Sequence, residues 1–163
     1  MTDHRRTPAA LLRPTGRPRV PQLVLPARLS AVPEARHWVA AQCGPRLSAG
    51  ERQVVELLTS ELVANAVLHG GAPPEGAVGD PGAPGEGSVE VRVSGAAGAV
   101  RVAVHDGNPE PPQLRHVGAE ATGGRGVALV DALATRWGHA PLPPPAVGKA
   151  VWFELALAGA PAT

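Results

Sequence analysis

The stretch from Ser48 to His69 reads SAGERQVVELLTSELVANAVLH, and it contains the strongest local signals for the fold. Ser48 is followed three residues later by Glu51, a capping box that satisfies free backbone N–H groups at the start of a helix. Gly70 and Gly71 come next and are typical of a helix end. The sequence therefore predicts one long helix that runs to His69.

A line of polar side chains interrupts the apolar face of this helix. Glu61, Asn65 and His69 follow one another at intervals of four residues, so they are expected in one line through the middle of that face. Buried polar groups without partners are costly, so either the fold satisfies these three or the helix borders a ligand site. A site of metal ligands alone is excluded, because no second histidine lies three or four residues from His69. At about 100° per residue, the apolar face comprises Val54, Val55, Leu57, Leu58, Leu62, Ala66 and Leu68, and the opposite side Arg52, Glu56, Thr59 and Ser60.

Shorter apolar patterns flank the long helix. Residues 22–29 predict a strand, and Ser30 is expected to cap a helix that reaches about Gln42. Beyond the long helix, valines alternate with other residues on both sides of a turn at residues 94–98, which predicts a β-hairpin with one buried face. The residues expected to face inward are Ala31, Ala35, Trp38, Val39, Val89, Val91, Val93, Val100, Val102 and Val104.

The C-terminal part adds a helix and a strand. The helix is expected from Val127 to about Trp137, and the strand follows the proline-rich residues 141–145, with Val151, Phe153, Leu155 and Leu157 on one side. The predicted order is strand, helix, helix, strand, strand, helix, strand. Because helices and strands do not alternate regularly, this order favours a two-layer α+β sandwich over a doubly wound sheet.

The composition fits a single domain with low-complexity segments. A chain of 163 residues with 44% hydrophobic content can bury one core. Its 20 glycines and 19 prolines make about a quarter of the chain, a level at which disordered segments are expected. We expect a disordered Arg/Pro-rich arm over residues 1–21, a domain over 22–158 and a tail over 159–163. Within the domain, residues 71–87 are expected to form a flexible insert, since ten of them are Gly or Pro.

Charge and composition also exclude several classes of function. The formal net charge of +1 is too small to drive nonspecific binding to a polyanion, and 2% aromatic residues cannot form base-stacking platforms, so no nucleic-acid partner is expected. The single cysteine, Cys43, can form neither an internal disulfide nor a multi-cysteine metal site, which fits a reducing compartment. Neither a run of about 18 apolar residues nor a signal peptide is found. We expect a cytoplasmic protein without a membrane partner.

Four motifs, in order along the chain, resemble those of a known family. ELVANAVLH (residues 61–69) resembles the asparagine-bearing helix motif of the GHKL superfamily of Bergerat-fold, histidine-kinase-like ATPases and kinases. VHDGNP (104–109) is similar to its first glycine box, GGRGVALV (123–130) to its second, and GKAVWFEL (148–155) to its closing strand. The resemblance covers about residues 23–157 and implies a mixed, mostly antiparallel sheet with helices on one face. Because no phospho-acceptor histidine region is seen before the domain, we expect its nearest members to be stand-alone bacterial regulators similar to anti-sigma-factor serine/threonine kinases.

The resemblance implies a site for ATP and Mg²⁺. Asn65 would hold the metal against the triphosphate, and Glu61 would act as general base on the attacking hydroxyl. Asp106 would accept the adenine amino group, with Gly107 letting the base approach. The free N–H groups of the following helix would meet phosphate. The resemblance also assigns to the nucleotide site His69, Gly124, Arg125, Gly126, Val127 and Lys149.

Structural alternatives stay open for several of these residues. Asp106 and Gly107 could form an ordinary turn, residues 123–126 could be only a helix entry, and Lys149 could be exposed at a strand start. In addition, Ala150 stands where relatives often carry threonine after Gly-Lys. The expected ATP lid over residues 107–124 is stiffened by prolines.

Two functions follow from these observations. The first is a Mg-ATP-dependent serine/threonine protein kinase that binds a sigma factor or its antagonist in a partner switch; kinases of this kind are often homodimers. The second is a non-catalytic ATP-sensing regulator that binds a protein. Glu61 favours catalysis, whereas Ala150 and the proline-rich lid favour the regulator.

Overall fold

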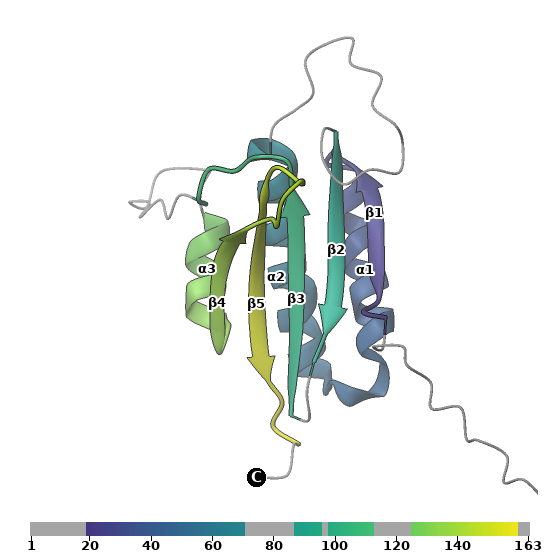
Figure 1. The fold of residues 1–163 in the computed structure, drawn as a ribbon. Coiled ribbons are helices and arrows are strands. Elements are labelled where there is room, and N and C mark those ends of the chain that lie inside the picture. Colours follow the sequence, from purple (N-terminus) through teal and green to yellow (C-terminus); the bar gives the residue numbers. More distant parts are fainter. Residues whose placement is uncertain (1–18, 71–86, 96–97, 113–124, 160–163) are drawn as a thin grey trace, which may run out of the picture.

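The protein consists of a five-stranded sheet with its helices packed on one face, as seen in a computed structural model that describes residues 19–70, 87–95, 98–112 and 125–159 (Figure 1). The expected two-layer α+β sandwich is thereby confirmed. All of the expected insert (71–87) except Gly87, most of the arm (1–21) and lid (107–124), and all of the tail (159–163) except Gly159 lie outside the described residues. In the described part of the chain, no helix is long and apolar enough to cross a membrane.

Two helices dominate the helical layer. α1 spans Ala31–Cys43 and α2 spans Ala49–His69. The capping box before α2 is confirmed: the Ser48 side chain accepts a hydrogen bond from the Glu51 backbone N–H, and the Glu51 carboxylate accepts from that of Ser48. The expected cap of α1 is wrong, because Ser30 has a helical backbone conformation and its side chain makes no capping bond.

The sheet has the order β1-β2-β3-β5-β4, and every described pair of strands is antiparallel, in agreement with the mostly antiparallel sheet that was expected. β1 spans Gln22–Pro26, β2 Ser88–Ser94, β3 Ala99–Asp106 and β5 Lys149–Ala156. The predicted hairpin is β2 and β3. Its inward side chains are buried and form the core with β5 and the helices. The buried side chains of β2, β3 and β5 in this core are Val89, Val91, Val93, Val100, Val102, Val104, Val151 and Phe153.

The last helix is shorter than expected, and a strand follows it. α3 spans Arg125–Leu133 and ends before Trp137, which lies in β4 (Arg136–Pro141). Two contacts explain the difference. The indole Nε1 of Trp137 donates to Asp131 in α3 at 2.8 Å, and a Cβ on Gly138 would lie 2.9 Å from the ring of Trp152, so Gly138 lets β4 pair closely with β5.

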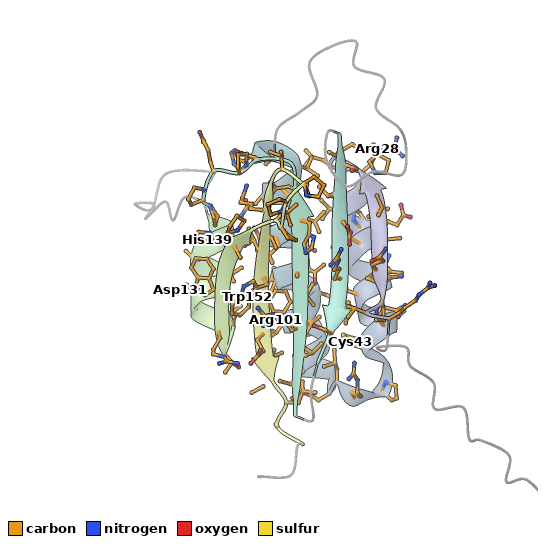
Figure 2. All side chains as sticks on the ribbon, viewed as in Figure 1. Arg28, Cys43, Arg101, Asp131, His139 and Trp152 are labelled. Carbon is orange, nitrogen blue, oxygen red and sulfur yellow. The ribbon has the colours of Figure 1, made fainter. Side chains whose placement is uncertain are left out.

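The outer face of the sheet, away from the helices, carries polar side chains and one indole. The guanidinium of Arg101 lies 3.7 Å from the centre of the Trp152 ring, a cation–π contact. Figure 2 shows these two side chains next to each other on β3 and β5. No described helix packs against this face (Figure 1).

The buried face of α2 is rotated by roughly a quarter turn from the expected one. Thr59, expected on the solvent side, is fully buried, whereas Leu57 and Leu68 are 40% and 61% exposed. The reason is α1, which packs on the Thr59 side of α2, where Arg52 donates hydrogen bonds to the carbonyl groups of Ala40 and Gly44. The line of polar residues therefore lies at the edge of the buried face instead of its middle.

Candidate functional site

Several expected site residues gather at one end of the sandwich. There β3 ends at Asp106, β5 begins at Lys149 and α2 ends at His69 (Figure 1). The chain also enters α3 at this end, and α3 packs against α2. The topology thus brings together segments that are about 40 to 80 residues apart in the sequence.

The polar line on α2 is available to a ligand. The side chains of Glu61 and Asn65 are half-buried, and His69 is exposed. Within the described part of the chain, none of these three side chains makes a hydrogen bond or an ion pair. The described part of the fold therefore gives Glu61 and Asn65 no partner, although it removes part of their surface from water. This arrangement favours the ligand interpretation over the core interpretation.

Asp106 and Lys149 form a buried ion pair. The Nζ atom of Lys149 lies 2.9 Å from Oδ1 of Asp106, and the two side chains are 7% and 3% exposed. Nζ also donates to the backbone carbonyl of Asn108 at 3.0 Å. The alternative in which Lys149 is exposed at a strand start is thus wrong, because Asp106 and Lys149 are register partners at the paired ends of β3 and β5.

Asn108 connects this ion pair to α2. Its backbone N–H donates to Oδ1 of Asp106 at 2.9 Å, and its side-chain Nδ2 donates to the carbonyl oxygen of His69 at 2.7 Å. Its Oδ1 accepts from the backbone N–H of Glu110 at 2.9 Å. The segment after β3 is therefore an Asx turn tied to the end of the long helix.

Two glycines permit this close packing. A Cβ on Gly148, whose φ is +132°, would lie 1.9 Å from the carbonyl oxygen of Asp106 and 3.0 Å from Cα of Gly107. A Cβ on Gly70 would lie 2.0 Å from the carbonyl oxygen of Ala66 and 2.9 Å from Cβ of Asp106. Asp106 is thus held between the backbones of α2 and β5.

The second glycine box is only partly described. Arg125 is the first residue of α3, and with Gly126 and Val127 it belongs to the first turn. Gly124 lies outside the described residues, as do the side chains of Arg125 and Val127. Contact of these residues with phosphate therefore stays a prediction. Its basis is that the first N–H groups of a helix have no intrahelical partner and attract anions.

His105 precedes Asp106 but lies on the outer face of the sheet, in register with Glu90. Burial lowers the pKa of His105, and the nearby charge of Arg92 lowers it further, while the carboxylates of Glu90 and Asp106 oppose the shift. Glu90 is buried beside Arg92, whose Nε donates to it. This cluster is separated from the α2 side chains by the sheet.

Sequence reasoning names Asp106 and Lys149 but misses three residues that support them. Gly70 is predicted only as a helix end, Gly148 appears only in the closing-strand motif, and Asn108 appears only in the first glycine box. The Asp-Gly-Asn sequence directly after a strand is a signal for an Asx turn and could have identified Asn108. Gly148 offered no such signal, because its close neighbour is 42 residues away in the sequence.

The donor set suits a phosphate-bound magnesium ion better than a metal site made of protein alone. In the described part of the chain, no group of three or more His, Cys, Asp or Glu could hold a metal. The amide of Asn65, which has no bond in the described part of the chain, offers one oxygen, and Mg²⁺ commonly takes one or two protein oxygens together with phosphates and water.

The comparisons with known proteins agree with this geometry. The family model described as "Histidine kinase-like ATPase domain" matches residues 25–140, which include α2, the hairpin and α3. Among curated proteins, no match was found.

Proposed function

The chain belongs to the histidine kinase-like ATPase family and is thereby an ATP-binding domain; on this premise we propose that it is a Mg-ATP-dependent serine/threonine protein kinase that acts in an anti-sigma-factor partner switch. The observation that carries the proposal is the pair Glu61 and Asn65. These side chains are half-buried one helical turn apart on α2, and neither has a partner in the described part of the fold.

Each residue has a role that follows from its chemistry. The amide oxygen of Asn65 would hold Mg²⁺, which supplies charge neutralisation for the triphosphate when bound. The carboxylate of Glu61, one turn nearer the N-terminus of α2, would take the proton of a serine or threonine hydroxyl on the partner protein. The carboxylate of Asp106 would accept a hydrogen bond from the amino group of adenine.

A non-catalytic regulator is the second candidate, and one observation favours it. The segment after β3 is fixed by Asn108 and by the Asp106–Lys149 pair, and it continues into Pro109, Pro111 and Pro112. A stiff segment at this place limits closure over a nucleotide. In this candidate the same site binds ATP and thereby orders a surface for the partner, without phosphate transfer.

One experiment distinguishes the two candidates. The protein is captured from its native cell with its copurifying partner, and the complex is incubated with γ-labelled ATP and Mg²⁺. The kinase proposal expects label on a serine or threonine of the partner. A partner that stays unlabelled while its binding depends on ATP supports the regulator and contradicts the kinase.

A further inference from the structure

The Asx turn after β3 is formed by Asp106, Asn108 and Glu110, and the ion pair between Asp106 and Lys149 is an additional interaction. Lys149 is the only lysine of the chain, and its side chain is 93% removed from solvent at the start of β5. Two of its three ammonium hydrogens have acceptors, Oδ1 of Asp106 and the carbonyl of Asn108. A buried lysine is costly unless it is paired, so this arrangement needs a reason.

The bonds of Asp106 are unequally divided between its two oxygens. Oδ1 accepts from Lys149 and from the backbone N–H of Asn108. In the described part of the chain, no hydrogen bond reaches Oδ2. Gly70 packs against Cβ of Asp106 and Gly148 against its backbone, so the two bonds to Oδ1 extend from a closely packed base. Oδ2 is thereby left as the acceptor for a ligand.

Lys149 determines which oxygen of Asp106 is left for a ligand. A carboxylate that is 3% exposed is costly to bury without a cation beside it, and it accepts hydrogen bonds but donates none. Because the ammonium group bonds Oδ1, a ligand group that donates is directed to Oδ2.

We infer that Lys149 is a positioning residue for base recognition: it orients Asp106 so that Oδ2 accepts from an exocyclic amino group and rejects a base with a carbonyl oxygen there. This inference rests on the proposed nucleotide site. It assigns to Lys149 no contact with the nucleotide.

Other ionisable groups near Asp106 do not replace Lys149. On β3, His105 faces the opposite side of the sheet, beside Glu90 and Arg92 of β2. On α2, His69 is exposed and offers its backbone carbonyl, not its ring, to the segment after β3. Glu110, in that segment, is exposed. On β5, Lys149 itself is the cation that bonds Asp106.

The first test observes the ion pair without nucleotide. Since the chain has one lysine, protein labelled with ¹⁵N-lysine gives a single ammonium signal. We expect slow hydrogen exchange of this signal in the parent protein and fast exchange in Asp106→Asn. Exchange in the parent as fast as in free lysine would overturn the inference.

The second test measures Kd for ATP and for inosine triphosphate, whose base carries a carbonyl oxygen in place of the amino group. A hydrogen bond to a charged group predicts that the parent prefers ATP by about ten- to a hundredfold. Lys149→Met should lose most of this preference, because Oδ1 of Asp106 no longer has the ammonium group that holds the carboxylate in place. Contacts to the phosphates are common to both nucleotides and cancel in the ratio.

The controls separate this role from a structural one. Arg101→Met removes a positive charge from the outer face of β3 and should leave the ratio unchanged. Lys149→Met/Asp106→Asn buries no charge, so it keeps the inference testable if the single variant does not fold; it should also lose most of the preference for ATP. A preference for ATP in Lys149→Met or in the double variant that is as large as in the parent overturns the inference alone. A parent that binds neither nucleotide overturns the proposed function as well.

Discussion

Replacement of Gly148 by alanine tests how tightly the end of β5 must approach Asp106. The new Cβ would lie 1.9 Å from the carbonyl oxygen of Asp106, whereas ordinary contact begins at 3.4 Å, so the two backbones would have to separate by about 1.5 Å. A residue other than glycine at φ +132° adds strain of about 1–3 kcal/mol. Overpacking of this kind adds about 1–3 kcal/mol more. We expect Gly148→Ala to lower the free energy of unfolding by about 2–6 kcal/mol.

Urea denaturation of the parent and the variant measures this effect. Gly50→Ala is the matched control, because a Cβ there meets nothing within 4 Å and the residue lies in the first turn of α2. Alanine is a better helix former than glycine, so the control should gain up to about 1 kcal/mol. A loss below about 1 kcal/mol in Gly148→Ala, or an equal change in both variants, would refute the close approach of the two strand ends.

Three further substitutions test separate parts of the account. Asn65→Ala should abolish the Mg²⁺ dependence of ATP binding in calorimetry without lowering the melting temperature, because its side chain makes no bond in the described part of the fold; unchanged Mg-ATP affinity would contradict the assignment. Thr59→Val should raise the free energy of unfolding by about 1 kcal/mol, since its buried hydroxyl has no partner among the described residues, whereas Thr135→Val should lower it because the Thr135 hydroxyl accepts from the backbone N–H of Ala156. The hydrogen bond from the Ser48 side chain, together with those from the backbones of Ala158 and Ser48, lowers the pKa of Glu51 below its usual 4.5. The stabilising effect of Glu51 is therefore present above pH 4.5 and is lost as the pH falls through the lowered pKa. Glu51→Gln should be less stable than the parent at pH 7, with the difference shrinking at acid pH, and a difference independent of pH would argue against this role.

The elements that local patterns specify were predicted well. The capping box placed the start of α2, and the alternating valines placed the β2–β3 hairpin with its buried face. β4 was missed because its sequence, RWGHAP, has no apolar alternation, and Gly138 is explained only by the Trp152 ring of the neighbouring strand. The orientation of α2 depends on α1, so burial of Thr59 could not follow from the periodicity of α2 alone.

The candidate site shows the same division between local and tertiary information. Glu61 and Asn65 could be identified from their spacing on one helix, and the structure leaves both without partners in the described part of the fold. The burial of Lys149 could not be identified, because it follows from pairing with Asp106, 43 residues away. A sequence with one lysine at a strand start predicts an exposed side chain unless the position of its counter-ion is known.

Glu61 provides the most direct test of the proposed kinase activity. Parent protein and Glu61→Gln are compared for Mg-ATP affinity and for the rate at which label from ATP appears on the copurifying partner. Glutamine keeps the shape of the side chain but loses the base, so we expect similar affinity and transfer at least about a hundredfold slower, as is typical of a lost general base. Label transferred at the same rate by both proteins, or by neither, would contradict the account.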